Sequence, residues 1–299
     1  MKRKLLKRLF PMLLLTAATV GLLMIAAAAD IPTVEDIKTG EQVYANSMGE
    51  VDYSNLSEGF VSVRYTGGKN VRIKVQITCA QGTTYTYNLN NSGDFETFPL
   101  VEGDGEYIVK LFENTYGTRY AQALSLRLTL SLRNEFLPFL YPNQYVNYTQ
   151  DSQTVTTAAE LVKDQTTDLQ KLGKIYRFVV DTLTYDYEKA ENVQSGYLPV
   201  LDDVLESKTG ICFDYAALMA AMLRSQGIPC KLVVGYAGTV YHAWINVYLR
   251  EQGWVEHAIY FDGTNWKLMD PTFASTGKSS IYVLKYIGNV KNYSEKYAY

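Results

Sequence analysis

Three side chains in the second half of the chain have the residue types of a cysteine nucleophile, its base and its orienting group. They are Cys212, His242 and Asp270. A cysteine thiolate is a strong nucleophile, a nearby histidine can take and return its proton, and a carboxylate can hold the imidazole in the productive tautomer. Taken singly, each of these residues is also common in purely structural positions. The elements that position them therefore decide between the two interpretations.

Cys212 lies at the predicted start of a helix, directly after a glycine and an isoleucine. Apolar residues recur on one side of this helix, namely Phe213, Ala216, Ala217, Ala220 and Leu223. The predicted helix stops at Gly227, and Pro229 follows. Unpaired N–H groups at a helix N-terminus carry partial positive charge and favour a thiolate. The pattern therefore places Cys212 well for nucleophilic attack.

His242 begins a strand-like run after a glycine-bearing loop, and Asp270 ends a later run. The apolar runs of this region are 231–236, 243–249, 254–261 and 266–269. An earlier helix is predicted over residues 168–182, because Thr167 and Gln170 have capping-box spacing and apolar residues follow at helical intervals. Helices followed by an antiparallel sheet indicate an α+β domain, in which neighbouring strands can bring distant positions together.

The combined pattern resembles the transglutaminase-like superfamily, whose catalytic Cys, His and Asp occur in this order on a helix and two strands. The stretches that carry the resemblance are 210–216, 223–229, 242–244 and 269–272. They fall within residues 165–275, and the first half of the chain has no such match. There are two departures. Cys230 stands where the family more often has a small residue, and an additional run with His257 lies between the strands of His242 and Asp270.

The resemblance implies a papain-like, transglutaminase-like α+β catalytic domain over residues 151–299. In it Cys212 would attack a peptide or glutamine carboxamide carbonyl and form a thioester, His242 would transfer protons, and Asp270 would orient the imidazole. Transfer of the acyl group to water would make the chain a protease or amidase. Transfer to an amine would make it a cross-linking enzyme. The substrate would be a protein or peptide, cell-wall peptide included.

The oxyanion of this reaction needs hydrogen-bond donors. The backbone N–H of Cys212 is one expected donor, and the candidates for the second are Tyr185, Tyr187 and Gln194. No cofactor is implied, and the two histidines and three scattered cysteines lack the close spacing that metal sites use. A non-catalytic scaffold or cell-surface binding protein with the same fold remains the alternative function.

The first half of the chain has the pattern of a different domain. The runs 61–65, 71–77 and 107–111 alternate apolar with polar residues between turn residues, which predicts an all-β, Ig-like β-sandwich over residues 30–135. Residues 136–150 contain prolines and lack a period, which predicts a linker. Tyrosines are frequent in this half, for example Tyr65, Tyr85, Tyr87 and Tyr107. They suit packing across a sheet, with stacking on sugars as the alternative.

Residues 1–29 have the order of an export signal. Five basic residues precede an apolar run from Leu9 to Ile25, and four alanines end it. The segment is either cleaved or kept as an anchor through residues 9–29, because its length also suits a membrane span. Either outcome predicts a secreted or extracytoplasmic protein. Without this segment 23 Lys and Arg stand against 31 Asp and Glu, which argues against a nucleic-acid partner.

The three cysteines, Cys79, Cys212 and Cys230, are odd in number, so at least one is expected to be a free thiol. Cys230 is expected to begin an apolar strand in the core, and a bridge between Cys79 and Cys230 stays open. His257 is expected on a sheet face.

Overall fold

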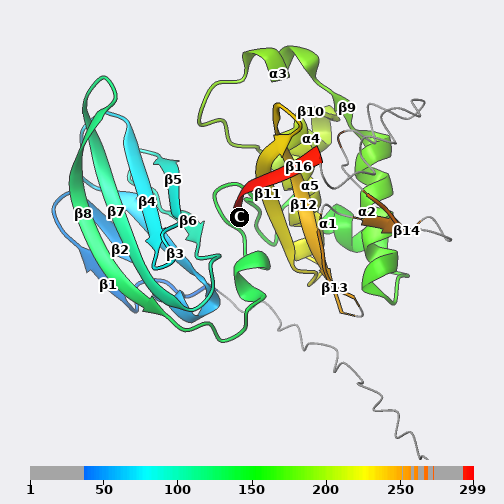
Figure 1. The fold of residues 1–299 in the computed structure, drawn as a ribbon, viewed down its shortest axis with the longest axis horizontal. Helices are drawn as coiled ribbons and strands as arrows, with labels where there is room; N and C mark the ends of the chain where they lie inside the picture. Colours follow the sequence, from blue (N-terminus) through cyan, green and yellow to red (C-terminus); the bar gives the residue numbers. More distant parts are fainter. Residues whose placement is uncertain (1–36, 251, 257–258, 262–265, 269–271, 273–291) are drawn as a thin grey trace, which may run out of the picture.

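The computed structural model describes residues 37–250, 252–256, 259–261, 266–268, 272 and 292–299. The predicted export signal, His257 and Asp270 lie outside the described residues. A β-rich first half stands beside a second half of helices and strands, and the C-terminus lies between them (Figure 1). Among the described helices, none has the length and apolar character needed to cross a membrane.

The first half consists of two four-stranded antiparallel sheets. One has the order β1-β2-β3-β6, with β1 Val43–Ala45, β2 Gly49–Asp52, β3 Phe60–Tyr65 and β6 Glu96–Pro99. The other has the order β5-β4-β7-β8, with β5 Thr84–Leu89, β4 Ile73–Cys79, β7 Gly105–Tyr116 and β8 Arg119–Leu130. A turn of 3₁₀ helix, η1 Leu56–Glu58, precedes β3.

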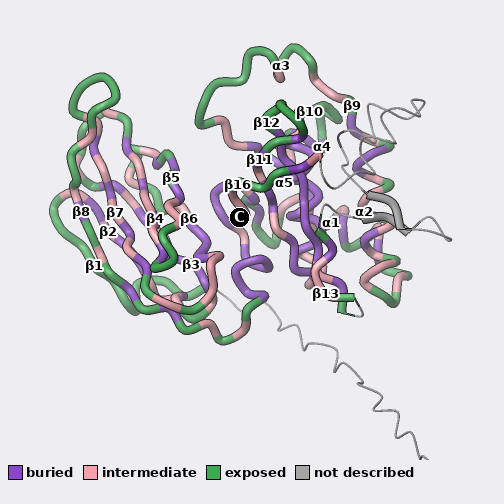
Figure 2. The backbone as a smooth tube through the Cα atoms, viewed as in Figure 1, coloured by how far each residue is buried: buried purple, intermediate pink, exposed green. Residues whose placement is uncertain are grey.

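Burial alternates along these strands, as expected for strands with one face in a core (Figure 2). The three predicted runs are strands β3, β4 and β7, which confirms them. Four tyrosines of this half are buried, namely Tyr65, Tyr85, Tyr87 and Tyr107. The packing interpretation of these tyrosines is therefore confirmed, because buried rings cannot stack on a sugar.

In the described part of the second half, five helices surround a mixed set of strands. The helices are α1 Gln153–Val162, α2 Asp168–Thr182, α3 Tyr187–Asn192, α4 Leu201–Ser207 and α5 Cys212–Arg224. Its main sheet is antiparallel with the order β13-β12-β11-β16, from β13 Gly253–Val255, β12 Val240–Leu249, β11 Cys230–Ala237 and β16 Tyr293–Ala298. Two short pairs complete it, β9 Thr184–Tyr185 with β10 Thr209–Gly210, and β14 Ile259–Phe261 with β15 Trp266–Leu268.

The predicted helix boundaries are largely those observed. The capping box of α2 is present, because Thr167 accepts from the Gln170 N–H while the Gln170 side chain accepts from the Thr167 N–H. Helix α5 starts at Cys212 as predicted. It ends at Arg224 instead of Gly227, whose φ of +73° belongs to the turn that follows.

The structure adds to the sequence pattern of α5 and differs from it in the run 254–261. Residues 214–224 of α5 are all buried, so this helix has no solvent face, because it packs between β11 and β12 on one side and α1, α2 and α4 on the other. Its alanines make this close packing possible. The run 254–261 is not one strand, because Glu256 lies in a turn after β13 and β14 pairs in a separate sheet.

The segment 136–150 is packed between the halves. It contains a 3₁₀ turn, η2 Leu137–Phe139, whose residues are buried. The Tyr148 hydroxyl donates to the carbonyl of Leu140 at 2.9 Å. The Gln144 amide donates to the carbonyl of Asn88 on β5 at 2.5 Å. One buried apolar cluster accordingly contains residues of both halves.

Candidate active site

Cys212 is the first residue of α5 and is partly exposed. Ile211 before it is extended, with φ −96° and ψ 176°, so the chain enters the helix directly at the cysteine. The carboxylate of Asp214, in the first helical turn, reaches back and accepts from the Ile211 N–H at 2.8 Å. The N–H groups of this first turn have no partner within the helix. Cys212 therefore stands at an electropositive end of a rigid, buried helix.

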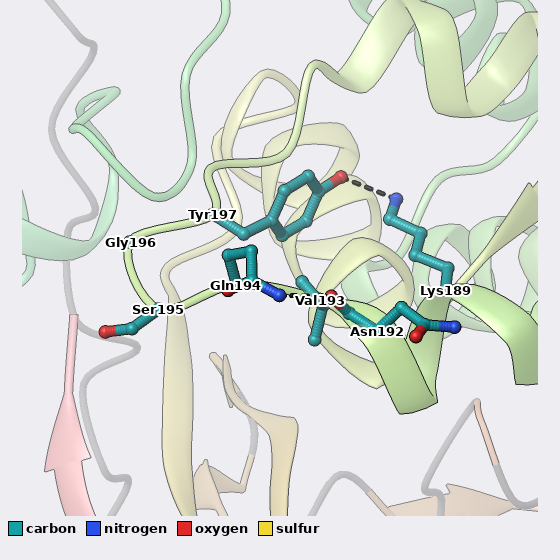
Figure 3. A pocket seen from close by; sticks show the side chains of 7 residues that line it. All are labelled: Lys189, Asn192, Val193, Gln194, Ser195, Gly196 and Tyr197. Carbon is teal, nitrogen blue, oxygen red and sulfur yellow. Dashed lines mark hydrogen bonds between the residues drawn. The ribbon is translucent and has the colours of Figure 1, made fainter.

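Asp214 also ties a second segment to this end of the helix. Its carboxylate is fully buried and accepts from the Lys189 ammonium at 2.7 Å and from the Tyr197 hydroxyl at 2.6 Å. The ammonium of Lys189 also lies 2.6 Å from the Tyr197 hydroxyl (Figure 3). Burial and the charge of Asp214 raise the pKa of Tyr197, so its hydroxyl stays a donor. Residues 189–197 are thereby held beside Cys212.

His242 lies near the start of β12 and is 5% exposed. Its ring stacks near that of Trp244, with centroids 6.3 Å apart. Gly235 on β11 is its cross-strand partner, at a register irregularity between β11 and β16. A Cβ at Gly235 would lie 2.1 Å from the Ser294 carbonyl and 2.9 Å from the Trp244 ring. Only a glycine lets β16 and Trp244 pack this closely beside the histidine.

Cys212 and His242 line one cavity of about 710 Å³. The described residues that complete its wall come from both halves of the chain: Lys74, Thr86, Asn88, Tyr145, Tyr185, Ala190, 193–197, Ile211, Phe213, Val234, Val240, Tyr241, Ala243 and Tyr299. Burial raises the pKa of Tyr145 to about 12 and raises that of Tyr241. These phenols are therefore neutral at physiological pH and can donate hydrogen bonds.

The candidate oxyanion donors differ in position. Tyr185 and Gln194 line the cavity, whereas Tyr187 does not appear among its described lining residues. Tyr187 is 67% exposed and packs its ring edge-on against Tyr185, with centroids 5.0 Å apart. The structure therefore brings two of the three candidates to the cavity.

The cysteines are all free thiols, so the bridge between Cys79 and Cys230 is not present. Cys230 begins β11 and has no exposed surface, which confirms it as a core residue. Burial raises the pKa of its thiol to about 12. Within the described ranges, no three His, Cys, Asp or Glu side chains gather as metal ligands.

Several residues around the cavity were missed by sequence reasoning. Asp214 could have been found, because an acidic residue in the first turn of a predicted helix is a known capping signal. Lys74, Tyr145 and Tyr299 could not, because they come from segments far apart along the chain and carry no local motif.

Comparison with known families matches residues 155–259 to the transglutaminase-like superfamily. An uncharacterized protein of Bacillus subtilis, YebA, is 29% identical over an alignment of 119 positions, and the match covers 33% of this chain and 16% of that protein. A protein-glutamine gamma-glutamyltransferase of Pseudomonas aeruginosa is 36% identical over an alignment of 70 positions, and the match covers 18% of this chain and 10% of that protein. The matches thus span a small part of these relatives' own lengths.

Two solved structures are similar at low identity. A candidate cysteine protease from Cytophaga hutchinsonii has a TM-score of 0.41 and 15% identity, covering 86% of this chain and 84% of that one. Red sea bream transglutaminase has a TM-score of 0.29 and 11% identity, covering 77% of this chain and 53% of that one. The family model assigns residues 155–259 to the transglutaminase-like superfamily, and the mixed helix and strand content of the second half agrees with a transglutaminase-like, papain-like fold.

Proposed function

We propose that this chain, whose residues 155–259 form a transglutaminase-like domain, is an exported cysteine enzyme that transfers acyl groups from peptide or glutamine amide bonds. The observation that carries the proposal is the cavity shared by Cys212, at the start of α5, and His242, on β12. A nucleophile at a helix N-terminus and a base on an adjacent strand are the minimum that thioester chemistry needs.

In the proposed reaction the Cys212 thiolate attacks the amide carbonyl, and the oxyanion that forms accepts from the Cys212 N–H. Tyr185 or Gln194 would supply the second donor, because both line the cavity. His242 then protonates the leaving amine or ammonia as the carbon–nitrogen bond breaks, which leaves a thioester. Water or an amine attacks this thioester, His242 takes the proton, and the thiolate leaves. Asp270 would hold the imidazole throughout.

The proposal also covers where the enzyme acts and on what kind of substrate. The basic and apolar order of residues 1–29 would send the chain out of the cytoplasm, with the segment cleaved or retained as an anchor. Residues 30–135 would serve as an Ig-like accessory domain, which their two four-stranded antiparallel sheets support. A protein or peptide outside the cytoplasm, such as a cell-wall peptide, would then be the substrate.

The thiol can be tested without a substrate. Iodoacetamide should label Cys212 first at neutral pH, because Cys212 is partly exposed whereas Cys230 is fully buried with a raised thiol pKa. Labelling should slow in His242→Ala, which removes the imidazolium that stabilises the thiolate. A Cys230→Ala variant is the matched control and should label like the parent. Equal labelling of both cysteines in the folded protein would contradict the assignment.

Turnover identifies the reaction. The purified protein is incubated with a glutamine-containing protein, with and without a fluorescent primary amine, while ammonia release, cleavage and label incorporation are followed. Incorporation of the amine indicates cross-linking, and ammonia or new peptide ends alone indicate hydrolysis. Cys212→Ala should abolish both. Binding of the protein substrate without turnover in the parent would favour the non-catalytic scaffold instead.

A further inference from the structure

The cavity that holds Cys212 and His242 differs in charge from the rest of the molecule. The full chain has more acidic than basic residues, 31 against 28. Yet none of the described residues lining the cavity is an Asp or Glu, and Lys74 is the one Lys or Arg among them. A positive side chain in a concave, partly apolar site raises the local concentration of anions. The charge of the described wall thus favours an anionic group on the bound molecule.

Lys74 is available for such a group. It lies on β4 and is half-buried, and its ammonium sits 5.4 Å from the centre of the Tyr120 ring. In the part of the chain that the structure describes, no carboxylate forms an ion pair with it. An aromatic neighbour holds a cation in place without neutralising it. The ammonium is therefore positioned and still able to pair with an anion.

Neutral polar residues of β5 stand beside Lys74 in the sheet. Asn88 is directly opposite Lys74 in the pairing of β4 with β5, and Thr86 lies on the same exposed face of β5. The segment 193–197 of the catalytic half reaches this strand, because a Cβ on Gly196 would lie 2.4 Å from the Asn88 side-chain nitrogen. Lys74, Thr86 and Asn88 consequently form a polar wall of the cavity that belongs to the first half of the chain.

We propose that this wall is a subsite for a carboxylate of the peptide acyl donor, bound by Lys74 and flanked by the Thr86 hydroxyl and the Asn88 amide. The inference rests on the proposed function, because it names the class of peptide that this site would take. The carboxylate belongs either to an acidic side chain near the reacting amide or to the C-terminus of the peptide. The first half of the chain then selects the substrate on which the second half acts.

The test uses peptides with one central glutamine and otherwise neutral residues. The first has a glutamate beside the glutamine and an amidated C-terminus, the second has glutamine in place of that glutamate, and the third keeps neutral side chains but has a free C-terminal carboxylate. We expect kcat/KM for either the first or the third peptide to exceed kcat/KM for the second peptide about five- to tenfold, as expected for one partly exposed ion pair. Which of them does so identifies the source of the carboxylate. The preference should shrink as salt is added.

Variants of the wall separate the subsite from the chemistry. Lys74→Gln should abolish the preference by lowering kcat/KM for the carboxylate peptide to that for the second peptide, and Lys74→Glu should reverse it. Lys110→Gln is the matched control, because Lys110 lies on the neighbouring strand β7 and does not appear in the cavity wall. A preference that persists in Lys74→Gln, or its absence in the parent, overturns the subsite.

If no peptide is turned over, measurements of peptide binding test the subsite instead. Affinities of the peptides for the Cys212→Ala protein are then measured by calorimetry, with and without Lys74→Gln. Tighter binding of a carboxylate peptide that depends on Lys74 supports the subsite even when the acyl-transfer proposal has failed. Equal affinities contradict the subsite, whatever the turnover result.

Discussion

The carboxylate of Asp214 connects three groups near Cys212. It accepts hydrogen bonds from Ile211, Lys189 and Tyr197 and has no exposed surface. Breaking a buried ion pair by removing one partner is costly, although Lys189, with 27% of its side chain exposed, can partly rehydrate. We therefore expect Asp214→Asn to lower the free energy of unfolding by about 2–3 kcal/mol, as measured in urea.

The same variant should loosen the start of α5 and the segment 189–197, so alkylation of Cys212 should change rate in the folded protein. Asp214→Glu should restore part of the stability, because it keeps the charge. Asp164→Asn serves as the control, because Asp164 is exposed after α1. If Asp214→Asn matched that control in stability and in the alkylation rate, Asp214 would have no role in positioning Cys212.

At the residue scale, the sequence was informative where a position is defined by its own neighbours. Cys212 could be assigned to a helix start because the apolar spacing of that helix begins directly after it, and His242 to a strand because the mostly apolar run 243–249 follows it. Lys74 and Tyr299 carry no such signal. They reach the cavity only through the packing of the two halves, which a single sequence does not encode in a local pattern.

At the scale of elements, the N-terminus of α1 is capped from outside its own segment. Asp202, in the first turn of α4, accepts from the Gln153 N–H at 3.0 Å, the Thr154 N–H at 2.9 Å and the Thr154 hydroxyl at 2.7 Å. Ser152, which precedes the helix, makes no side-chain cap bond. Asp202 therefore holds α1 and α4 together at one end.

This cap should depend on pH. Burial by itself raises the pKa of Asp202, but the hydrogen bonds from Thr154 and Gln153 outweigh it and lower the pKa below its ordinary value. In an unfolded chain an Asp carboxyl has a pKa of about 4. A carboxyl whose pKa is lower in the folded protein stabilises the fold fully above that unfolded-state pKa, and this stabilisation is lost as the pH falls through the folded-state pKa. Asp202→Ala should cost about 1 kcal/mol at pH 7. The cost should diminish toward pH 3, as followed by urea unfolding at each pH.

An Asp202→Asn variant keeps an acceptor and should be less destabilised, with no carboxyl at this position to titrate. A cost of Asp202→Ala that is the same at pH 3 and pH 7 would show that the charged cap contributes nothing.

The two caps explain which helices could be predicted. The capping box of α2 is local, since Thr167 and Gln170 are three positions apart, and the helix was predicted with its observed bounds. The start of α1 depends on Asp202 from another helix, and α1 was not predicted. The burial of α5 on its other sides likewise depends on α1, α2 and α4 packing against it, which its one-sided apolar pattern does not indicate.

At the scale of the molecule, segment 136–150 supplies part of the interior of the second half. The guanidinium of Arg224 is fully buried and donates to the carbonyls of Tyr141 at 2.8 Å, Cys230 at 2.9 Å and Tyr299 at 2.7 Å. The ring of Tyr145 packs edge-on against Phe213 and Tyr299. Three distant segments therefore meet at one cation, and one of them is the predicted linker.

Fragments of the chain test this arrangement. Residues 151–299 are predicted from the sequence to fold alone, but this fragment lacks Tyr141 and leaves one donor of Arg224 without its partner. We expect the fragment 134–299 to be more stable by about 2–4 kcal/mol, because an orphaned buried donor and lost aromatic contacts both carry a cost. Thermal and urea unfolding of both fragments and of residues 37–299 would measure the difference. If the two fragments melted identically, residues 136–150 would contribute nothing to the stability of the second half, as expected of a linker.

The cavity takes Cys212 and His242 from one half of the chain and Lys74, Thr86 and Asn88 from the other. Substitutions on the face of β4 and β5 that carries Lys74, Thr86 and Asn88 would therefore change which substrates bind without changing Cys212 or His242. Among related proteins, we therefore expect the residues of this wall to vary more than the residues around Cys212 and His242. If the proposed function holds, the two halves would give selection two different surfaces on which to act.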